Sequence, residues 1–456
     1  MPWKLLIEAL GTTVAIELGG YAEATLEAVA EAWRDALAAD QGTDAAATVS
    51  ARAAAYAPDD IASLLSDLSQ RVTLAAIEAR RGELWMLHAA GVAASDGRVV
   101  VLVGPSGRGK TTAARTLGAA FGYVSDETVA IDAEGRVWPY RKPLSIIEQP
   151  DRPKTQRAPT DLGLRPLPEA PLRLAAIVVL DRGESVGDPS VELMDLGDVL
   201  ADLVEQSSYL SSMPAPLRTI AAQVQAFGGV RRVSYAEASS LAPVVAALAT
   251  EPAVAPAAIG GSIVPQAREQ ASHADGPLYS RAPVHDALAL DDPDRIALLQ
   301  VDADGQGVVR VLAGIAPVLW RAADAASLDD LVAVAVAALG APEAGDADEL
   351  VADAVASLVE AGVIVRGGVW SLREDVAWTD SHDRVVALAL SDDAASPLAL
   401  EGSAAVIWRA LAEGPAPADQ VAARAAAAAG VAPEDVAEDV AAFLTTLQSA
   451  ALAERR

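Results

Sequence analysis

The chain has 456 residues, enough for roughly two to four domains that bury cores of their own. It carries 63 acidic and 34 basic residues, which gives a formal net charge of −29, and hydrophobic residues make up 52% of it. This composition argues against a binder of nucleic acid or of anionic lipid and against a disordered chain. The absence of cysteine excludes disulfides, zinc–thiolate sites, iron–sulfur clusters and cysteine nucleophiles.

The start of the chain, MPWKLLIEALG, lacks the basic region and the long apolar core of a secretory signal. The longest apolar runs, such as residues 174–180, have the length of a strand and are far shorter than a membrane span. We therefore expect a soluble, cytoplasmic protein.

The first 80 residues indicate a small α+β lead-in. Apolar patterns predict strands over residues 5–10 and 12–18, and helical spacing predicts helices over residues 22–39 and 61–81. No residue of this segment indicates a chemical role.

After residue 83 the pattern changes to that of a phosphate-binding α/β domain. A buried strand (98–103) runs into a glycine-rich loop (104–112), and a helix and a strand pair (123–132) follow. We expect the Pro- and Arg-rich stretch 138–171 to be loop. A second buried strand (174–183) comes before the helices that end this domain.

The glycine-rich loop, GPSGRGKT, fits the motif G-x-x-x-x-G-K-[ST] in the required strand–loop–helix context. Its glycines let backbone N–H groups face one concavity, Lys110 brings a positive charge to the β- and γ-phosphates, and Thr111 offers a hydroxyl to Mg²⁺. The sequence thus predicts a site for ATP and Mg²⁺. The residues assigned to this cofactor are Gly104, Ser106, Gly107, Gly109, Lys110, Thr111 and Thr112.

Three acidic residues, an adjacent pair and one more distant aspartate, are candidates for the remaining chemistry. Asp126 and Glu127 follow the loop after one helix, at a strand end, where one carboxylate can hold Mg²⁺ and the other can accept a proton from an attacking hydroxyl. Asp181 ends a hydrophobic strand and is also a candidate metal ligand, so the sequence does not rank Glu127 against Asp181. These acids can also be ordinary turn residues, and His88 can be a packed structural histidine.

The segment LHAAGV (87–92), the glycine-rich loop and GYVSDETVAID (122–132) resemble the catalytic core of HPr serine kinases, P-loop kinases with a fold like that of phosphoenolpyruvate carboxykinase. The resemblance covers roughly residues 80–250 and implies that His88 is an active-site histidine and Asp126 the catalytic acid/base. The double acid is Asp-Glu here instead of Asp-Asp, and the later signature L-E-x-R-G-x-G is missing, so HPr itself is a poor candidate for the substrate. The closer likeness is to HPr-kinase-like proteins found beside peptide-modification pathways.

Residues 251–282 are rich in Pro, Gly, Ala and Ser without periodicity, which predicts a linker. The rest of the chain repeats itself, and a Trp-Arg-Ala triplet at 320–322 recurs at 408–410 within segments of similar pattern. The two triplets are 88 residues apart. A period of about this length predicts two copies of one small domain, each with two or three strands followed by three helices. We place the first copy at residues 283–370 and the second at 371–456.

Both copies resemble PqqD-like domains, which serve as recognition elements for the leader peptides of ribosomally synthesised and post-translationally modified peptides (RiPPs). Such a domain holds the leader as an extra strand on its sheet, beside its third helix. In the first copy the predicted leader-binding residues are those of one edge strand: Val308, Val309, Arg310, Val311 and Leu312.

The groove of the first copy would also involve helix 349–361, and that of the second copy residues 398–400 and helix 436–448. We expect Pro397 to remove a strand donor from the second copy, which favours the first copy as the peptide site. The alternative for both copies is a pair of winged-helix-like domains that make oligomer contacts.

Together these patterns predict a P-loop α/β domain of the phosphoenolpyruvate-carboxykinase/HPr-kinase type over residues 1–250, followed by two small α+β winged-helix-like PqqD-type domains. The preferred function is an ATP-dependent kinase that phosphorylates a hydroxyl of a precursor peptide recruited by the carboxy-terminal domains. The alternative is a non-catalytic recognition protein that presents the leader to other modification enzymes of the same pathway. We expect no nucleic-acid partner and no membrane.

Overall fold

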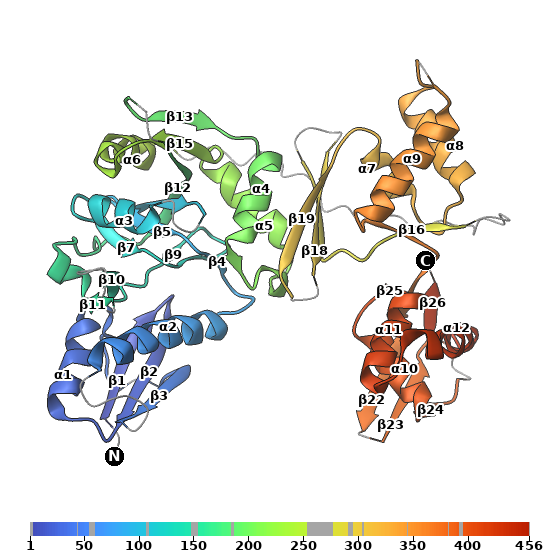
Figure 1. The fold of residues 1–456 in the computed structure, drawn as a ribbon, viewed down its shortest axis with the longest axis horizontal. Helices are drawn as coiled ribbons and strands as arrows, with labels where there is room; N and C mark the ends of the chain where they lie inside the picture. Colours follow the sequence, from blue (N-terminus) through green and yellow to red (C-terminus); the bar gives the residue numbers. More distant parts are fainter. Residues whose placement is uncertain are drawn as a thin grey trace. The chain divides into compact units, whose positions relative to one another are not determined.

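The structure is a computed structural model that describes most of the chain. The described residues are 3–42, 44–53, 60–105, 109–146, 154–183, 187–252, 277–290, 295–302, 305–343, 345–381, 383–391 and 395–455. They form a mixed α/β protein (Figure 1) whose contacts divide it into two compact units, Met1–Ser262 with Ala297–Arg310 and Ile263–Ile296 with Val311–Arg456. None of the helices described is both long and apolar enough to cross a lipid bilayer.

The first unit begins with a small α+β segment, drawn in blue in Figure 1. Strand β1 (Trp3–Ala9) pairs antiparallel with β2 (Thr12–Gly19), and β3 (Ala47–Arg52) joins β2 in parallel. Helix α1 (Glu23–Ala32) follows β2, and α2 (Ile61–Ala79) packs on β2 and β3. The apolar residues of α2 recur at helical spacing, so one side of the helix is buried against the sheet.

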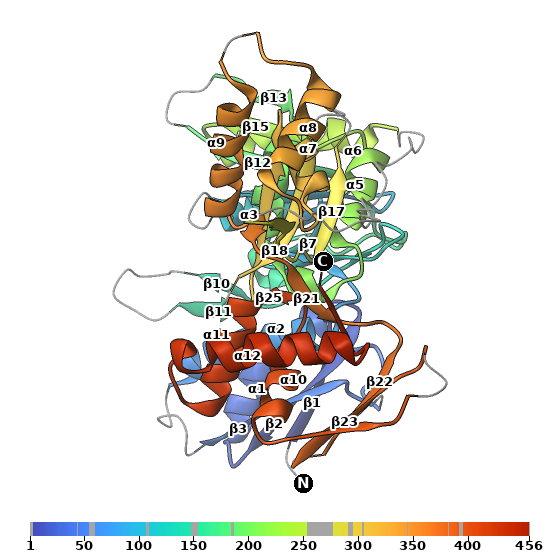
Figure 2. The same cartoon turned by 90° about the vertical axis from the view of Figure 1, so that its right-hand side faces the viewer.

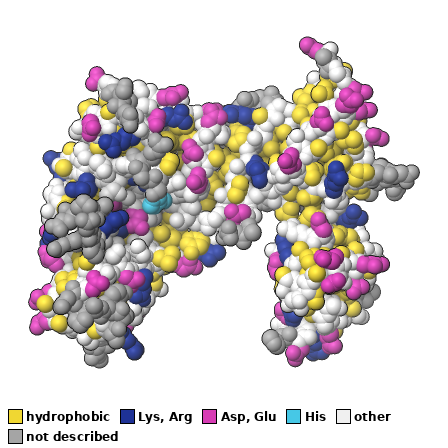
Figure 3. Space-filling view, viewed as in Figure 1, with side chains coloured by type: hydrophobic (Ala, Val, Ile, Leu, Met, Phe, Trp, Pro, Cys, Tyr) yellow, Lys and Arg dark blue, Asp and Glu magenta, His cyan; other side chains and the backbone are white. Residues whose placement is uncertain are grey.

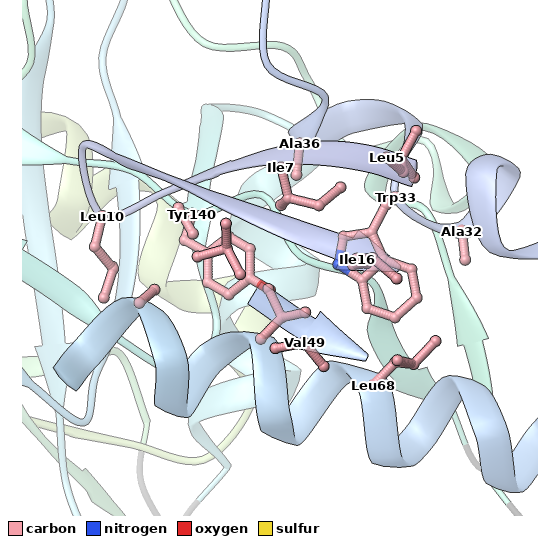
Figure 4. Close-up of a cluster of buried hydrophobic side chains, with 14 of the residues drawn as sticks. Leu5, Ile7, Leu10, Ile16, Ala32, Trp33, Ala36, Val49, Leu68 and Tyr140 are labelled. Carbon is pink, nitrogen blue, oxygen red and sulfur yellow. The ribbon is translucent and has the colours of Figure 1, made fainter. Parts of the chain in front are cut away.

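The side chains of these strands and helices meet in one apolar core (Figure 4). Trp33 is fully buried there and leaves the helical conformation, so α1 ends earlier than the predicted helix. Tyr140, from the segment after the predicted nucleotide loop, lies in the same core as Leu68 and Val49. The lead-in and the phosphate-binding part of the first unit therefore share a core.

A six-stranded mixed sheet carries the glycine-rich loop. Its strand order is β13-β15-β12-β6-β5-β7, with β6 parallel to β12 and β12 parallel to β15. The strands are β5 (Ala90–Ala93), β6 (Arg98–Val103), β7 (Gly122–Ser125), β12 (Arg173–Arg182), β13 (Ser190–Leu193) and β15 (Arg231–Tyr235). Helices α3 (Lys110–Gly118) and α6 (Leu241–Thr250) share a core with this sheet, which explains the unbroken apolar run of β6.

A second sheet of the first unit has the order β14-β4-β8-β9, and β10 and β11 form a separate antiparallel pair. The strands are β4 (Trp85–Leu87), β8 (Val129–Ile131), β9 (Val137–Trp138), β10 (Leu144–Ile146), β11 (Thr155–Arg157) and β14 (Ser207–Ser208). Helices α4 (Leu196–Glu205) and α5 (Pro216–Ala226) also belong to this unit, as do residues Ala297–Arg310.

The expectation that residues 138–171 are only loop is wrong, because β10 and β11 lie within them. Leu144 is fully buried, and the side chain of Gln156 donates a hydrogen bond to Ser145 Oγ at 2.8 Å. These contacts hold two three-residue strands together. The sequence does not predict them, because the proline content of the segment is typical of a loop.

In the carboxy-terminal half the same order of elements occurs twice: a three-stranded sheet and then three helices. The first copy has β17 (Asp286–Ala289), β18 (Ile296–Val301), β19 (Gly307–Leu312), α7 (Ala316–Ala322), α8 (Leu328–Leu339) and α9 (Ala347–Glu360). The second copy has β22 (Val376–Ser381), β23 (Arg384–Ala389), β24 (Leu398–Glu401), α10 (Ser403–Ala412), α11 (Ala418–Ala429) and α12 (Pro433–Ser449). Figure 2 shows β22 and β23 beside the helices of the second copy.

Short strands complete this half. They are β16 (Tyr279–Arg281), β20 (Ile364–Arg366), β21 (Val369–Leu372), β25 (Ala416–Pro417) and β26 (Ala453–Arg455). Strand β16 pairs with β20, and β21 lies between β25 and β26. Strand β16 begins inside the segment predicted as linker, and residues 253–276 of that segment lie outside the described residues.

The repeated tryptophans have the same role in both copies. Trp320 on α7 is 1% exposed and Trp408 on α10 is 0% exposed. In the second copy Trp378 of β22 meets Trp408 edge to face, with ring centroids 6.1 Å apart. Arg409 forms a bidentate ion pair with Asp380. The repeat found in the sequence therefore coincides with a repeated core position.

Candidate nucleotide and peptide sites

The glycine-rich loop joins the end of β6 to the start of α3. Gly104 is buried directly after β6, and Gly109 precedes α3 with φ of 92°. A side chain at this left-handed φ would strain the backbone, so glycine is required where the loop turns into the helix. Ser106 and Gly107, both predicted to contact the cofactor, lie outside the described residues.

Lys110 is the buried cation of this loop. It is 7% exposed, and its Nζ donates a hydrogen bond to the carbonyl oxygen of Gly104. No carboxylate forms an ion pair with Lys110 among the described residues, and burial lowers the pKa of its ammonium group. The first backbone N–H groups of α3 also receive no cap from a side chain in the part of the chain that the structure describes. A buried cation at an uncapped helix start suits an anionic ligand such as a phosphate.

A cavity of about 390 Å³ opens at this loop. Its lining residues are polar or charged almost throughout: His88, Gly109, Lys110, Thr111, Thr112, Asp126, Glu127, Lys142, Ser145 and Lys154. Both predicted catalytic residues, His88 and Asp126, line this cavity. The predicted phosphate-binding residues from Gly109 to Thr112 and the predicted metal ligand Glu127 line it as well. Three residues to which the sequence assigned no role join them: Lys142, Ser145 and Lys154.

Asp126 lies at the end of β7 and is partly buried. The hydroxyl of Tyr123 donates a hydrogen bond to Asp126 Oδ1 at 2.9 Å. Burial raises the pKa of Asp126, the positive charge of Lys142 and the Tyr123 hydrogen bond act in the opposite direction, and the charge of Glu127 adds to the increase. A carboxylate with a raised pKa in a cavity is suited to accept a proton.

Glu127 is held on two sides. Its backbone oxygen accepts a hydrogen bond from the N–H of Ala89 at 3.1 Å, and its carboxylate forms an ion pair with Lys142. Lys142 is only 6% exposed, and its Nζ is also 3.3 Å from Ser69 Oγ on α2. The amino-terminal lead-in therefore contributes a contact to the cavity, which no local sequence pattern could have indicated.

His88 lies between β4 and β5. Its N–H donates a hydrogen bond to the backbone oxygen of Gln206 at 2.6 Å, and its side chain lines the cavity. Burial and then the charge of Lys110 lower the pKa of His88, so its imidazole is neutral at pH 7. A neutral imidazole donates a hydrogen bond from one ring nitrogen and accepts one at the other.

Asp181 is at the carboxyl end of β12, next to the strand that carries the loop. Its carboxylate accepts a hydrogen bond from Ser234 Oγ at 3.2 Å, and it does not line the cavity. Among the described residues no group of three or more His, Cys, Asp or Glu side chains could hold a metal ion. Thr111 and Glu127 are the residues of the cavity that would hold Mg²⁺ together with phosphate oxygens.

The predicted leader site of the first copy lies on β19, an edge strand of its sheet. Val308, Val309 and Val311 are partly buried, Leu312 is buried, and exposed Arg310 donates a hydrogen bond from Nε to Gln300 at 3.2 Å. This strand therefore has an apolar side and one long basic side chain.

The matching edge strand of the second copy is β24, where Leu398 is 37% exposed. The expectation that Pro397 removes a donor from this strand is wrong, because β24 begins at Leu398 and pairs with β23 over all four of its residues. The proline precedes the strand, and both copies keep an edge strand to which another chain could add.

Comparisons with known proteins bear on this second copy. Residues 389–453 match the family model described as "Coenzyme PQQ synthesis protein D (PqqD)". The match for the first copy stays a prediction. No curated protein matches the chain.

Among solved structures, the chain is similar to the Hpr(Ser) kinase/phosphatase from Coxiella burnetii at 12% identity. The match covers 36% of this chain and 92% of that chain with a TM-score of 0.22, a value too low to support an argument. The resemblance of the first unit to HPr kinases thus stays a prediction, and the segment 389–453 is similar to the PqqD family.

Proposed function

We propose that the chain is an ATP-dependent phosphotransferase of a RiPP pathway, which binds a precursor peptide through its PqqD-type half and phosphorylates a hydroxyl of that peptide. The observation that carries the proposal is the cavity in which Lys110 and Thr111 meet Asp126 and Glu127. The match of residues 389–453 to the PqqD family supports the peptide partner. We place the protein in the cytoplasm, where precursor and ATP are both present.

In this proposal each cavity residue has one task. The backbone of the glycine-rich loop and Lys110 bind the phosphates of ATP, and Thr111 and Glu127 orient Mg²⁺. Bound Mg²⁺ supplies positive charge that offsets the charge of the phosphates. His88 contributes a neutral hydrogen-bonding group beside Asp126.

The transfer balances with Asp126 as the proton acceptor. A peptide hydroxyl oxygen forms a bond to the terminal phosphorus while the bond from that phosphorus to the bridging oxygen breaks, and ADP leaves. The hydroxyl proton passes to the Asp126 carboxylate. The raised pKa of Asp126 makes it a stronger base than an exposed aspartate once it is ionised.

Nucleotide binding is the first claim to test. We expect Lys110→Ala to lower the affinity for ATP by about 100-fold or more, since a charge-assisted contact and its field are lost together. Calorimetric titration of ATP with Mg²⁺ into the full chain measures this. Lys4→Ala, an exposed lysine on β1, is the matched control and should bind ATP as the unchanged protein does. A folded Lys110→Ala protein that binds ATP normally would contradict the site.

The transfer itself is tested by incubating the full chain with labelled ATP and a candidate RiPP precursor peptide that contains a leader. We expect label on a serine, threonine or tyrosine of the peptide, and none with Asp126→Asn.

The PqqD match also favours a second function, a recognition protein without transfer. In that case the chain binds the leader and presents it to other modification enzymes of the pathway, and the nucleotide site is without a catalytic role. Peptide binding without labelled peptide, together with dependence of a partner enzyme on this chain, would establish this function instead.

A further inference from the structure

The cavity at the glycine-rich loop gathers lysines from a chain that uses very few. The chain has four lysines, Lys4, Lys110, Lys142 and Lys154, among its 34 basic residues, and the last three line this cavity. Figure 3 shows acidic side chains spread over the visible face, as a net charge of −29 requires. A cavity with three ammonium groups in such a protein is a local exception and favours an anionic ligand.

Lys142 and Lys154 do not belong to the glycine-rich loop. They come from the segment that contains the β10–β11 pair, in which Ser145 lies opposite Gln156 and accepts its side-chain hydrogen bond. Lys154 directly precedes β11, and Ser145 lies on β10. This pair of short strands therefore carries its own group of donors to the cavity, apart from those of α3.

Lys142 requires an anion because it is buried. A buried ammonium group without a partner is strongly destabilising, and here the partner is the Glu127 carboxylate. Glu127 is also the cavity residue from the acidic pair that would hold Mg²⁺. If Glu127 held Mg²⁺ with its carboxylate, Lys142 would need another anion in the same cavity, and a phosphate group could take that place.

We propose that Lys142 and Lys154 form a second anion subsite, which holds the terminal phosphate of a nucleoside triphosphate beyond the phosphates cradled by the glycine-rich loop. The two lysines then make the site selective for triphosphate over diphosphate. The proposal rests on the proposed function, because a nucleotide must first bind at the loop. In this proposal the β10–β11 segment distinguishes a nucleoside triphosphate from a diphosphate.

The test is the ratio of the dissociation constants of ADP and of a non-hydrolysable ATP analogue, both measured calorimetrically with Mg²⁺ on the full chain. We expect the unchanged protein to bind the analogue more tightly. Lys154→Ala should lower the analogue's affinity by about tenfold, the loss of one charge-assisted hydrogen bond, and change ADP binding less than about twofold. Lys4→Ala should leave both constants unchanged.

Lys154 is exposed, so its substitution is not expected to disturb folding. Lys142→Gln keeps a hydrogen-bond donor at the buried position and should also lower the ratio. An unchanged ratio in Lys154→Ala, or an equal loss for ADP and analogue, overturns the subsite while the loop site stands. If the unchanged protein binds neither nucleotide, the proposed function fails first, which is a separate result.

Discussion

Burial of Asp126 sets the pH range in which the proposed transfer can run. Its pKa is raised above the ordinary 3.8 of aspartate, first by burial. The carboxylate can accept a proton only when it is ionised, so the base is lost as the pH falls through this raised pKa. The pKa of His88 is lowered, so its imidazole is uncharged at neutral pH.

We therefore expect kcat/KM for peptide phosphorylation to fall about tenfold per pH unit on an acidic limb that lies above the usual range of aspartate. Initial rates are measured with labelled ATP between about pH 4 and about pH 8, the range in which carboxylates and histidine titrate. These rates locate the acidic limb. Asp126→Asn should abolish transfer, and His88→Gln should keep the limb. A limb that disappears in His88→Gln would assign the titration to the histidine instead.

Single residues also show which positions of the cavity a local sequence motif can predict. Lys110 and Thr111 were predicted because their motif is local and its strand–loop–helix context is visible in the sequence. Lys142 was not, because only the folded chain brings it to Glu127 and to Ser69 of α2. Asp181 and Glu127 were equal candidates in the sequence, and only the structure separates the one that lines the cavity.

At the scale of elements, the sequence predicts the strand and the helix that flank the glycine-rich loop, and it does not predict the short strands of the Pro- and Arg-rich segment. The buried strand β6 and helix α3 follow directly from their sequences. Strands β10 and β11 have three residues each, and their stability comes from pairing with one another, which periodicity over so few residues cannot reveal. Pro397 was misjudged for a similar reason, since its effect depends on the residue at which β24 begins.

The two edge strands β19 and β24 are competing candidates for the leader-binding site. The position of Pro397 in the sequence favours β19 of the first copy, whereas the PqqD match includes β24 of the second copy. We expect Leu398→Pro to weaken leader binding at least about tenfold, because proline removes a strand donor. Val309→Pro should have a smaller effect. Fluorescence titration of the labelled leader into the full-length variants measures both.

Leu398→Ala, which keeps the backbone donor, is the control for the lost side chain. The reverse order of effects, with Val309→Pro the more damaging, would place the leader on the first copy. No effect of either proline would mean that the leader does not bind as an added strand.

At the scale of the whole molecule, the organisation was visible in the sequence because anchors repeat. Trp320 and Trp408 are each followed by Arg-Ala in the sequence, and both side chains are buried. The shared core of the lead-in and the phosphate-binding part was not visible, because Tyr140 reaches it from a segment that reads as loop. A single sequence shows a repeat directly, whereas it does not show which distant segments are in contact.

The presence of both parts in one chain makes a prediction about the leader. If the carboxy-terminal half, whose residues 389–453 match the PqqD family, recruits the peptide for the cavity, binding of the leader raises the local concentration of the acceptor hydroxyl. For tethered partners this gain is on the order of 10²–10⁴. We therefore expect a precursor without its leader to show a KM raised at least about 100-fold with a much smaller change in kcat. Free leader added in trans should inhibit the intact precursor competitively and should not stimulate the leaderless peptide. Stimulation in trans would show instead that the leader acts by changing the state of the enzyme, since a tether works only when it is covalently joined to the acceptor.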